Sequence, residues 1–553
     1  MLLFKAFKAD SSHLENIIEI GDFCDNLNYQ DKALHFYLKA IDNAVTDVVK
    51  TSLWIKVGHQ FSYDNKFTKA EESYHRALEF SEQLAKEDML KYGPLLADNQ
   101  MALGRLYIEL NDNERAMDNY LLSLELMHQL SSKNPDQYDI ALAAIQLEVG
   151  GFYSQLMEFD LAENLYNQSL EIYNHHSSLD PNKYQNQLAA VYLGKAILLA
   201  RNRKYTDAEI NFLKAIDIYD DLMVNNPIQY EPQKASATMS LSVMYYHWGK
   251  YDKSEEGYKK TIAIYNRLIT ENPRRYEPSL AKTYLNLGSL YSTQSRYDLS
   301  EKMYLQSLKL RERLANENPK RFDPLLSHVL LNIAYMKKRR LYELFDMQQQ
   351  SEALTYIAKA EDILDQYDNQ LPWVQTYRAD VKRFKSYLIG ITKEDLLVQK
   401  RIDNTLDLEI KLQSENDLNI MISIQRQIID SLNQIFIDFP VNRRLLLKMA
   451  EAYGSVAGYY LFNQQYEEAE TSALKGLELD DSEAWINSYL ALSLLYQNKH
   501  KKALKIYEKF IDFQYDGMEM RDIFIEDLDA MEQGGNDHKN NSKIRDYLTG
   551  RKK

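Results

Sequence analysis

Residues capable of catalysis or metal binding occur in this sequence, but few have the spacing that such chemistry requires. His175 and His176 are the only adjacent histidines; a metal site there would need carboxylate ligands from elsewhere, and a solvated helix end explains the pair equally well. Cys24 is the single cysteine, which excludes an internal disulfide and a zinc site of several cysteines. Carboxylate pairs suited to acid–base catalysis are frequent among 81 acidic residues, so their spacing selects no site.

The motifs of common catalytic and cofactor sites are missing from the sequence. It contains no glycine-rich phosphate loop followed by Lys-Ser/Thr, no HExxH, no nucleophile elbow and no CxxC. The basic run KKRR at 337–340 could contact nucleic acid or an acidic partner, or form the solvated end of a helix. A formal net charge of −15 disfavours nucleic-acid binding, which needs a basic surface. We therefore expect no enzyme, catalytic residue, metal, cofactor or nucleic-acid partner.

Composition indicates a helical protein. The 553 residues include 18 glycines and 11 prolines, about 3% and 2%, against averages of roughly 7% and 5%. So few turn residues disfavour a β-sandwich and a nucleotide-binding α/β enzyme with glycine-rich loops. No apolar run reaches 18 residues, and the N-terminal apolar stretch is too short for a signal-peptide core. We expect a cytoplasmic location and no membrane partner.

The elements that would position any site repeat every 46 residues. Segments 226–269 and 272–315 align without a gap, and three columns of residues keep that period. The columns are a first small residue (Gly58, Gly104, Gly150, Ala196, Ser242, Gly288, Ala334), a second small residue (Ala70, Ala116, Ala162, Ala208, Ser254, Ser300) and an aromatic residue (Tyr74, Tyr120, Tyr166, Phe212, Tyr258, Tyr304). Apolar residues recur at three- and four-residue spacings within each period, which predicts a repeated pair of helices, A and B. The small residues let helix A approach helix B closely, and the aromatic ring fills the space beside them.

A two-residue motif separates the units. Asparagine or aspartate precedes proline at each junction: Asn134-Pro135, Asp180-Pro181, Asn226-Pro227, Asn272-Pro273 and Asn318-Pro319. Asparagine tolerates the left-handed conformation that ends many helices, and proline prevents continuation of the helix. Cys24 falls in a column held elsewhere by aromatics such as Phe61 and Tyr107, which predicts a buried packing thiol.

This pattern resembles the tetratricopeptide repeat. The second unit has the fuller motif, with Trp54, Val57, Gly58, Phe61, Ala70, Tyr74 and Ala77, and two C-terminal units around Ala457 and Ala491 have the family's usual 34-residue period. The longer central units are similar to repeats of the kinesin-light-chain type. The resemblance implies an all-α fold, a right-handed superhelical solenoid of about ten helical hairpins.

The repeat pattern divides the chain into four parts. Residues 1–365 form an N-terminal superhelix, 366–444 an irregular helical connector with degenerate repeats, 445–515 a C-terminal pair of repeats, and 516–553 a capping helix with a polar tail. After Ala334 the second small column slips by seven residues to Ala353. We expect the segment 337–353 to absorb this insertion as a longer helix or loop.

The resemblance also implies a function. Proteins of this family generally bind an extended or helical peptide in a concave groove lined by the A helices. The family's groove positions correspond here to Met101, Arg105, Leu147, Leu193, Arg201, Met239, Val243, Tyr246, His247, Lys282, Leu285, Asn286, Ser289, His328, Leu331, Asn332, Tyr335 and Arg339. Asn286 and Asn332 occupy a column that often binds the peptide backbone. The Lys/Asn set that clamps a C-terminal carboxylate in chaperone adaptors is not reproduced, which disfavours that role.

Three hypotheses follow. The first is a noncatalytic scaffold or adaptor that binds a protein or peptide partner in the groove. The second is a sensor or regulatory module of a larger signalling system, with its effector on another segment or chain, suggested by a first repeat that already includes residue 13. The third is an enzyme with its site in residues 366–444. Neither the partner nor the oligomeric state can be inferred from the sequence.

Overall fold

The structure is a computed structural model that describes residues 14–27, 29–180, 183–368, 371–536 and 538–550. The described residues are almost entirely helical, with one two-stranded sheet. The predicted all-α solenoid of helical hairpins is confirmed. Pro181 of the predicted junction motif and residue 13 lie outside the described residues. The chain forms two compact units, one from Met1–Arg340 with Gln350–Lys385 and one from Leu341–Gln349 with Ser386–Lys553.

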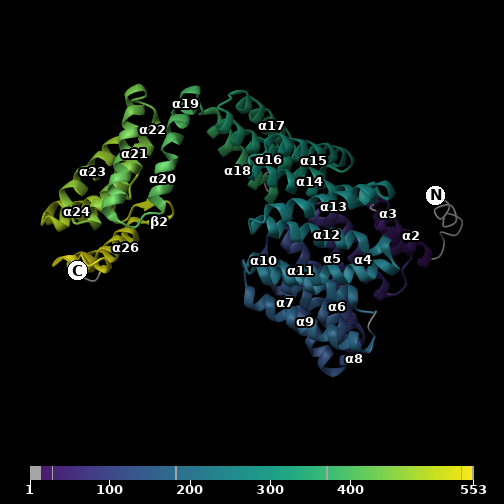
Figure 1. The fold of residues 1–553 in the computed structure, drawn as a ribbon. Coiled ribbons are helices and arrows are strands. Elements are labelled where there is room, and N and C mark those ends of the chain that lie inside the picture. The colour runs from purple at the N-terminus through teal and green to yellow at the C-terminus, as the bar shows by residue number, and fades with distance from the viewer. Residues whose placement is uncertain (1–13, 28, 181–182, 369–370, 537, 551–553) are drawn as a thin grey trace. The chain divides into compact units, whose positions relative to one another are not determined.

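The N-terminal unit is a series of helical hairpins, and from α2 to α15 each helix packs against the next one in the chain (Figure 1). Most of its helices have 21 residues. The helices are α2 (Leu14–Asn26), α3 (Gln30–Asn43), α4 (Asp47–Tyr63), α5 (Phe67–Glu87), α6 (Met89–Glu109), α7 (Asn113–Lys133), α8 (Pro135–Gln155), α9 (Phe159–Leu179), α10 (Gln185–Arg201), α11 (Tyr205–Asn225), α12 (Pro227–His247), α13 (Tyr251–Glu271), α14 (Pro273–Thr293), α15 (Tyr297–Glu317), α16 (Pro319–Leu344), α17 (Gln348–Leu364) and α18 (Pro372–Ile389).

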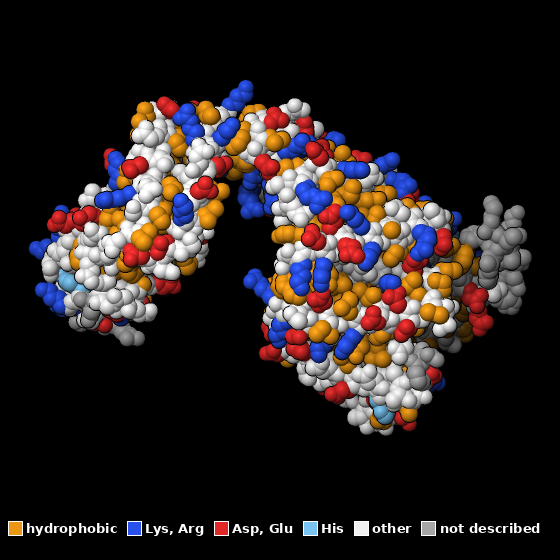
Figure 2. Space-filling view, viewed as in Figure 1, with side chains coloured by type: hydrophobic (Ala, Val, Ile, Leu, Met, Phe, Trp, Pro, Cys, Tyr) orange, Lys and Arg blue, Asp and Glu red, His pale blue; other side chains and the backbone are white. Residues whose placement is uncertain are grey.

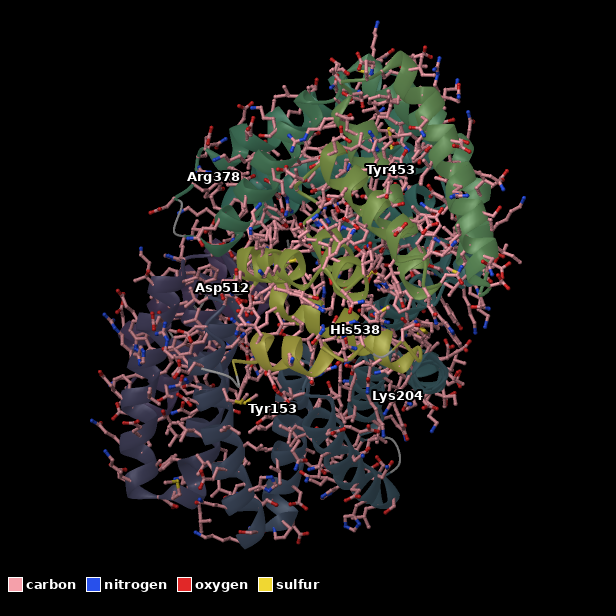
Figure 3. The ribbon with its side chains drawn as sticks, turned by 90° about the vertical axis from the view of Figure 1, so that its left-hand side faces the viewer. Tyr153, Lys204, Arg378, Tyr453, Asp512 and His538 are labelled. Carbon is pink, nitrogen blue, oxygen red and sulfur yellow. The ribbon has the colours of Figure 1, made fainter. Side chains whose placement is uncertain are left out.

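The C-terminal unit contains shorter hairpins around a core of its own. Tyr453, Asp512 and His538 mark this unit in Figure 3. Its elements are α19 (Lys393–Ile402), the 3-10 helix η1 (Asp403–Thr405), α20 (Leu406–Gln413), α21 (Leu418–Asp438), α22 (Arg443–Phe462), α23 (Tyr466–Leu479), α24 (Ile486–Tyr496), α25 (His500–Phe510), β1 (Gln514–Tyr515), β2 (Met518–Glu519), α26 (Met520–Gln533) and α27 (Asn541–Leu548).

The first small column and the aromatic column meet where the two helices of a hairpin cross. A methyl group added to Gly288 would lie 2.6 Å from the ring of Tyr304, and one added to Gly58 would lie 2.4 Å from that of Tyr74. Both distances are too short for a real contact, so the tyrosine ring occupies the space that a side chain on helix A would need. Cys24 is 1% exposed, as its column predicts.

The junction asparagines do not adopt the left-handed conformation that the sequence suggested. Asn226, Asn272 and Asn318 have φ of −146°, −143° and −143°, and their side chains instead cap the next helix: each Oδ1 accepts a hydrogen bond from the backbone N–H three residues later. Proline fits the first position of that helix, where its missing N–H leaves no bond unmade. These asparagines therefore start helix A rather than end helix B.

The left-handed residues lie instead in the turn inside each hairpin. Asn65, Asn111, Met157, Arg203, Gly249 and Ser295 have φ between 55° and 77° and follow one another at the 46-residue period. Gln464 and Asn498, 34 residues apart, occupy the same place in the C-terminal unit with φ of 61° and 62°. One turn geometry therefore serves repeats of both lengths. Gly249 and the asparagines at 65, 111 and 498 suit this geometry by residue type, whereas Met157, Arg203, Ser295 and Gln464 do not.

A tyrosine–glutamate contact links helix B of three long repeats to helix A of the next repeat. Tyr107 donates to Glu71 at 2.9 Å and Tyr291 to Glu255 at 2.8 Å, and Tyr245 donates to Glu209. Position 337, the next of this column, is a lysine that is 3% exposed.

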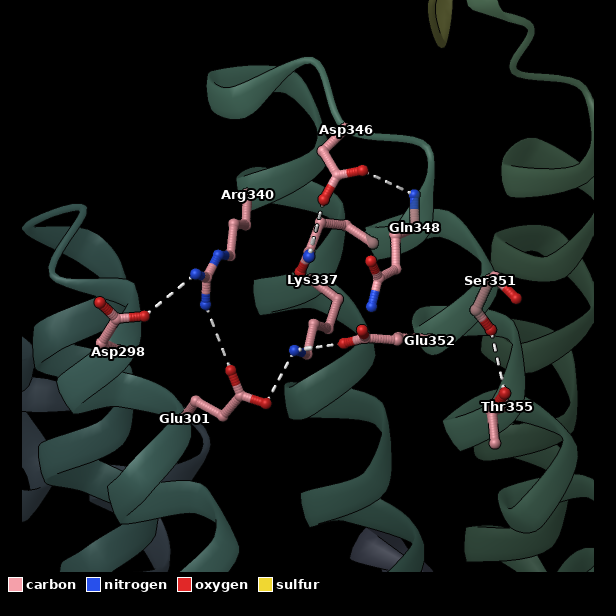
Figure 4. Close-up of polar contacts among 10 residues, drawn as sticks. Asp298, Glu301, Lys337, Arg340, Asp346, Gln348, Ser351, Glu352 and Thr355 are labelled. Atoms are coloured by element: carbon pink, nitrogen blue, oxygen red, sulfur yellow. Dashed lines mark hydrogen bonds and ion pairs between the residues drawn. The ribbon is translucent and has the colours of Figure 1, made fainter.

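Lys337 keeps the contact by pairing with two carboxylates. Its Nζ lies 2.7 Å from Glu301 and 2.5 Å from Glu352, and Arg340 also contacts Glu301 (Figure 4). Helix α16 is extended to 26 residues here, five more than α14, which accounts for most of the predicted seven-residue slip. Part of the KKRR run is thus buried in ion pairs rather than displayed as a basic patch.

The C-terminal tail is more structured than its composition suggests. The short β1–β2 hairpin precedes α26, and α27 follows the glycine-containing turn. Asn541 is 2% exposed and donates from Nδ2 to the hydroxyl of Tyr496 at 3.1 Å. Part of the predicted polar tail therefore begins a packed helix.

Candidate partner-binding groove

The predicted groove residues lie on the successive A helices α6, α8, α10, α12, α14 and α16. Four of them are buried: Met101, Met239, Leu285 and Leu331 are 2%, 8%, 4% and 3% exposed. Their side chains pack between helices and offer little surface to a partner. Leu147 and Leu193 are half-buried between neighbouring helices.

A second group of predicted residues makes contacts between consecutive A helices. Arg105 forms a bidentate pair with Glu148, with Nη2 2.5 Å from Oε2. Arg201 and Arg339 each donate to a carbonyl at the end of the preceding A helix, at 3.0 Å to Ser154 and 3.4 Å to Ser292. These residues position the repeats relative to one another.

The aromatic and polar members of the set also contact neighbouring residues. The ring of Tyr335 stacks on Phe384 at 4.2 Å between centroids, and Tyr246 hydrogen-bonds Thr293 at 2.9 Å. Burial, with the nearby Arg311 charge, lowers the pKa of His328, which stacks on Tyr377. The amide of Asn332 donates to the His328 carbonyl at 2.8 Å, and Ser289 contacts the hydroxyl of Tyr304 at 3.1 Å.

Six predicted residues meet in one cavity. A cavity of about 950 Å³ opens between α10, α11, α12 and α14, and Arg201, Met239, Val243, His247, Lys282 and Asn286 are among its lining residues. Ile197, Ala200, Ser240 and Met244 complete the contribution of the A helices. This is the place where the predicted groove positions form a concave site.

Three lining residues lie outside the A helices, where the sequence pattern could not predict them. Arg203, Tyr205 and Phe212 come from the A–B turn and from helix α11, whereas the family pattern places groove residues on helix A. The period could have located Arg203, because it stands in the column of left-handed turn residues.

Charge and polarity are unevenly distributed in this cavity. Ile197, Val243 and Phe212 provide apolar surface, and Arg201, Arg203, Lys282 and His247 provide basic groups. None of the described residues lining it is an aspartate or glutamate. By contrast, Figure 2 shows acidic and basic side chains intermixed over the visible face of the N-terminal unit. The cavity therefore favours an anionic ligand in a chain that is acidic as a whole.

Searches for other kinds of site gave two negative results. In the described part of the chain, no group of three or more His, Cys, Asp or Glu residues is arranged to hold a metal ion. Among the same residues, no helix is long and apolar enough to cross a membrane.

The fold defines a class of protein, the helical-hairpin solenoid. Sequence comparison identifies its repeats: residues 280–319 and 97–126 each match a family described as Tetratricopeptide repeat. The chain therefore contains tetratricopeptide repeats in its N-terminal unit. No curated protein matches the sequence.

Several solved structures resemble parts of the chain. BtubC (BKLC) from P. vanneervenii is 22% identical, with 44% of this chain and 90% of that chain covered and a TM-score of 0.35. The apo form of RapI is 16% identical, with 55% and 99% covered and a TM-score of 0.40. A Rap protein complexed with competence and sporulation factor is 14% identical, with 68% and 98% covered and a TM-score of 0.36. Scores this low support no argument about function.

Proposed function

We propose that this protein is a noncatalytic scaffold that binds a peptide segment of a partner protein in the groove formed by its A helices. The observation that carries the proposal is the cavity between α10, α11, α12 and α14, which combines apolar surface with four basic residues and no lining carboxylate. Tetratricopeptide repeats are generally protein-interaction modules, and stacked repeats form extended concave surfaces.

The cavity indicates which features the bound segment has. An apolar side chain would bury its surface against Ile197, Val243 and Met244, and a neighbouring carboxylate would accept charge-assisted hydrogen bonds from Arg203 or Lys282. The side-chain amide of Asn286 can donate to and accept from the peptide backbone. The predicted ligand is a segment with an apolar anchor beside one or more acidic residues.

A charge-reversal experiment tests this proposal. The double variant Arg203→Glu/Lys282→Glu changes two exposed basic residues at the cavity whose side chains take part in no hydrogen bond or ion pair with the described residues. The matched control Lys302→Glu/Lys309→Glu makes the same change in net charge on exposed positions of α15. Both variants, and the wild type, are used to capture partners for mass spectrometry, and a peptide from each candidate is then titrated into purified protein.

We expect the cavity variant to lose binding by at least about tenfold, which corresponds to about 1.4 kcal/mol, while the control binds like the wild type. Binding of the wild type should also weaken as salt is raised, because charged groups contribute to it. Equal binding by the cavity variant and the control would show that the partner does not use this cavity.

A further inference from the structure

Two parts of the N-terminal unit that lie far apart in the sequence touch each other. Residues between 26 and 66 contact residues between 274 and 321, and Figure 1 shows α2 and α3, in purple, beside the teal α13 and α14. The contacting residues are about 250 positions apart, which is between five and six repeats. After that number of repeats the superhelix has therefore completed one turn and meets its own beginning.

The strongest contacts join the turn after α4 to the start of α16. We call these contacts the seam. Asn318 donates from Nδ2 to the Asp64 carboxylate at 2.9 Å, and Asn65 donates to the Lys320 carbonyl. Arg321 donates to the Tyr63 carbonyl at 3.1 Å, and its guanidinium lies 3.0 Å from the centroid of the Tyr63 ring.

The burial of charged groups shows that the seam is a packed contact. Asp64 is 7% exposed and also pairs with Lys66 at 2.7 Å. Burial, opposed by the nearby Tyr63, Asp64 and Glu109, lowers the pKa of Arg321. A second, weaker set of contacts joins Arg275 to the Asn26 carbonyl at 3.5 Å and places Arg274 4.9 Å from the Tyr29 ring.

The repeat columns distinguish the seam from ordinary junctions. Positions 46 and 92 residues after Asp64 are Leu110 and Leu156, and those after Tyr63 are Glu109 and Gln155. Asn226, two repeats before Asn318, also caps its helix, but its Nδ2 bonds to the nearby Gln229 instead of a distant repeat. Asp64 is the one acidic residue of its column, which continues after Leu156 as Asn202, Trp248 and Gln294, and Tyr63 is the one aromatic ring of its column outside His247.

The seam is also incompletely packed. A cavity of about 690 Å³ runs beside it, lined by polar residues that include Gln30, Asp31, Lys66, Arg274 and Glu317. Such a contact is held by a few polar interactions over partly solvated surface, and these separate more easily than an apolar core. The helices on either side have their own cores and do not depend on the seam.

We propose that the seam is a latch that closes the first superhelical turn, and that its opening controls access of the partner to the groove. The second half of this statement rests on the function proposed above. Helices α10, α12 and α14, which form the basic cavity, lie in the chain between α4 and α16, the two helices that the seam joins. A closed latch makes their A-helix surface part of a closed turn, and an open latch lets a folded partner approach it from the side.

Distance measurements between two spin labels test the latch without any partner. Thr68 and Asn316 are both exposed, so Thr68→Cys and Asn316→Cys place labels on opposite sides of the seam, while Cys24 is 1% exposed. We expect one narrow, short distance distribution for the otherwise wild-type chain. Asn318→Ala/Arg321→Gln, which removes two of the three side-chain donors of the seam, should shift the distribution to longer distances.

The matched control is Asn226→Ala/Gln229→Ala. It removes the same helix cap two repeats earlier, where the residues make no seam contact, and should leave the distance unchanged. If the seam variant and the control give the same distribution as the wild type, or if the wild type is already open, the latch does not exist.

A cross-link tests access. Asn65→Cys/Lys320→Cys replaces two residues whose side chain and carbonyl are in contact, and the turn position tolerates other residues, since Met157 and Ser295 occupy it elsewhere. Oxidation should slow association of a partner peptide fused to a folded domain by about tenfold or more, because the disulfide prevents the seam from opening. Reduction breaks the disulfide and should restore the rate. An unchanged rate with a confirmed cross-link would overturn control of access. Failure of every form to bind the peptide would count against the proposed function, while the distance measurement would still decide whether the latch exists.

Discussion

Both units bury the apolar faces of their helices in helical hairpins, but the hairpins differ in length. In the N-terminal unit a typical hairpin pairs two 21-residue helices, such as α12 and α13, whereas α24 and α25 in the C-terminal unit have 11 residues each. Both kinds have a three-residue turn with a left-handed residue, at Trp248–Lys250 and at Gln497–Lys499. The added length therefore lies at the helix ends remote from the turn.

This difference shows which part of the repeat defines the hairpin and which part is adjustable. Near the turn, both units keep the second small column, with Ala208 and Ala469 at 0% exposed. Farther from the turn the first short repeat diverges: Gly288 faces Tyr304 in a long repeat, whereas the equivalent positions there are Ala457 and Ala473. The second short repeat keeps the ring as Tyr507, which is 0% exposed, so one repeat fills with two methyl groups the space that a large ring fills elsewhere.

The first prediction concerns this ring and has the largest expected effect. Tyr304→Ala should lower the free energy of unfolding of the N-terminal unit by about 3–5 kcal/mol, because it leaves a cavity beside Gly288. Tyr304→Phe should cost no more than about 1.5 kcal/mol, since it loses one hydrogen bond to Ser289 and phenylalanine stands in this column at Phe212. Urea unfolding of both variants measures the difference. A loss below 1 kcal/mol for alanine would mean that the long hairpins do not depend on the ring.

The second prediction concerns the turn that both units share. Gly249 has a φ of 77° with no atom near an added methyl group, so Gly249→Ala should cost about 1–2 kcal/mol through backbone strain alone. Met157→Gly, at a φ of 63°, should be neutral or stabilising by up to about 1 kcal/mol. Thermal unfolding checks the pair. If both changes shift stability in the same direction, the turn is not under the same backbone constraint in successive repeats.

The smallest predicted effect is an opposite response of the two units to pH. In the N-terminal unit burial disfavours the ionised form of Glu255, but hydrogen bonds from Arg296, Lys259 and Tyr291 outweigh it and lower its pKa to about 2. In the C-terminal unit burial raises the pKa of Asp527 to about 6. Glu255 therefore stabilises its unit above the unfolded value of about 4.3, and that stability is lost as pH falls toward 2. The contribution of Asp527 is present below about 3.9 and is lost as pH rises through 6.

Two isosteric variants measure these contributions. Glu255→Gln should remove part of the loss of stability between about pH 4.3 and pH 2, and Asp527→Asn should stabilise the C-terminal unit at pH 7 but not at pH 3. Unfolding followed by denaturant at several pH values gives both profiles. A gain from Asp527→Asn that is independent of pH would show that its carboxyl is not titrating in this range.

The fold could be predicted well from the sequence because each position of the hairpin recurs in several repeats, so its preferred residue type can be compared among them. The small and aromatic columns led directly to the contact between Gly288 and Tyr304. The conformation of Asn272 was predicted wrongly, because the same residue type suits both a left-handed helix end and a helix N-cap, and the sequence alone did not distinguish them. The left-handed turn was missed because five of its six residues in the long repeats are not glycine.

The groove was less predictable than the fold. Family positions located Lys282 and Asn286 but also selected Leu285, which is 4% exposed, since a helix in a solenoid buries some positions of its inner face against the neighbouring A helix. Arg203 lies outside helix A and so outside the pattern. The seam depends on how far each repeat rotates relative to the last, and small rotations accumulated over more than five repeats cannot be read from one repeat.

The buried Lys337 has a consequence for how this part of the chain can evolve. A single exchange of tyrosine for lysine in that column would have left a cation with one carboxylate, Glu301, in a place that is 3% exposed. The second carboxylate, Glu352, reaches it only because the intervening segment is seven residues longer than in the preceding repeats. The substitution at position 337 and the insertion after it are therefore coupled. We expect relatives that keep the ordinary repeat length here to have tyrosine at the position of Lys337. Relatives with the longer segment should retain the acids equivalent to Glu301 and Glu352.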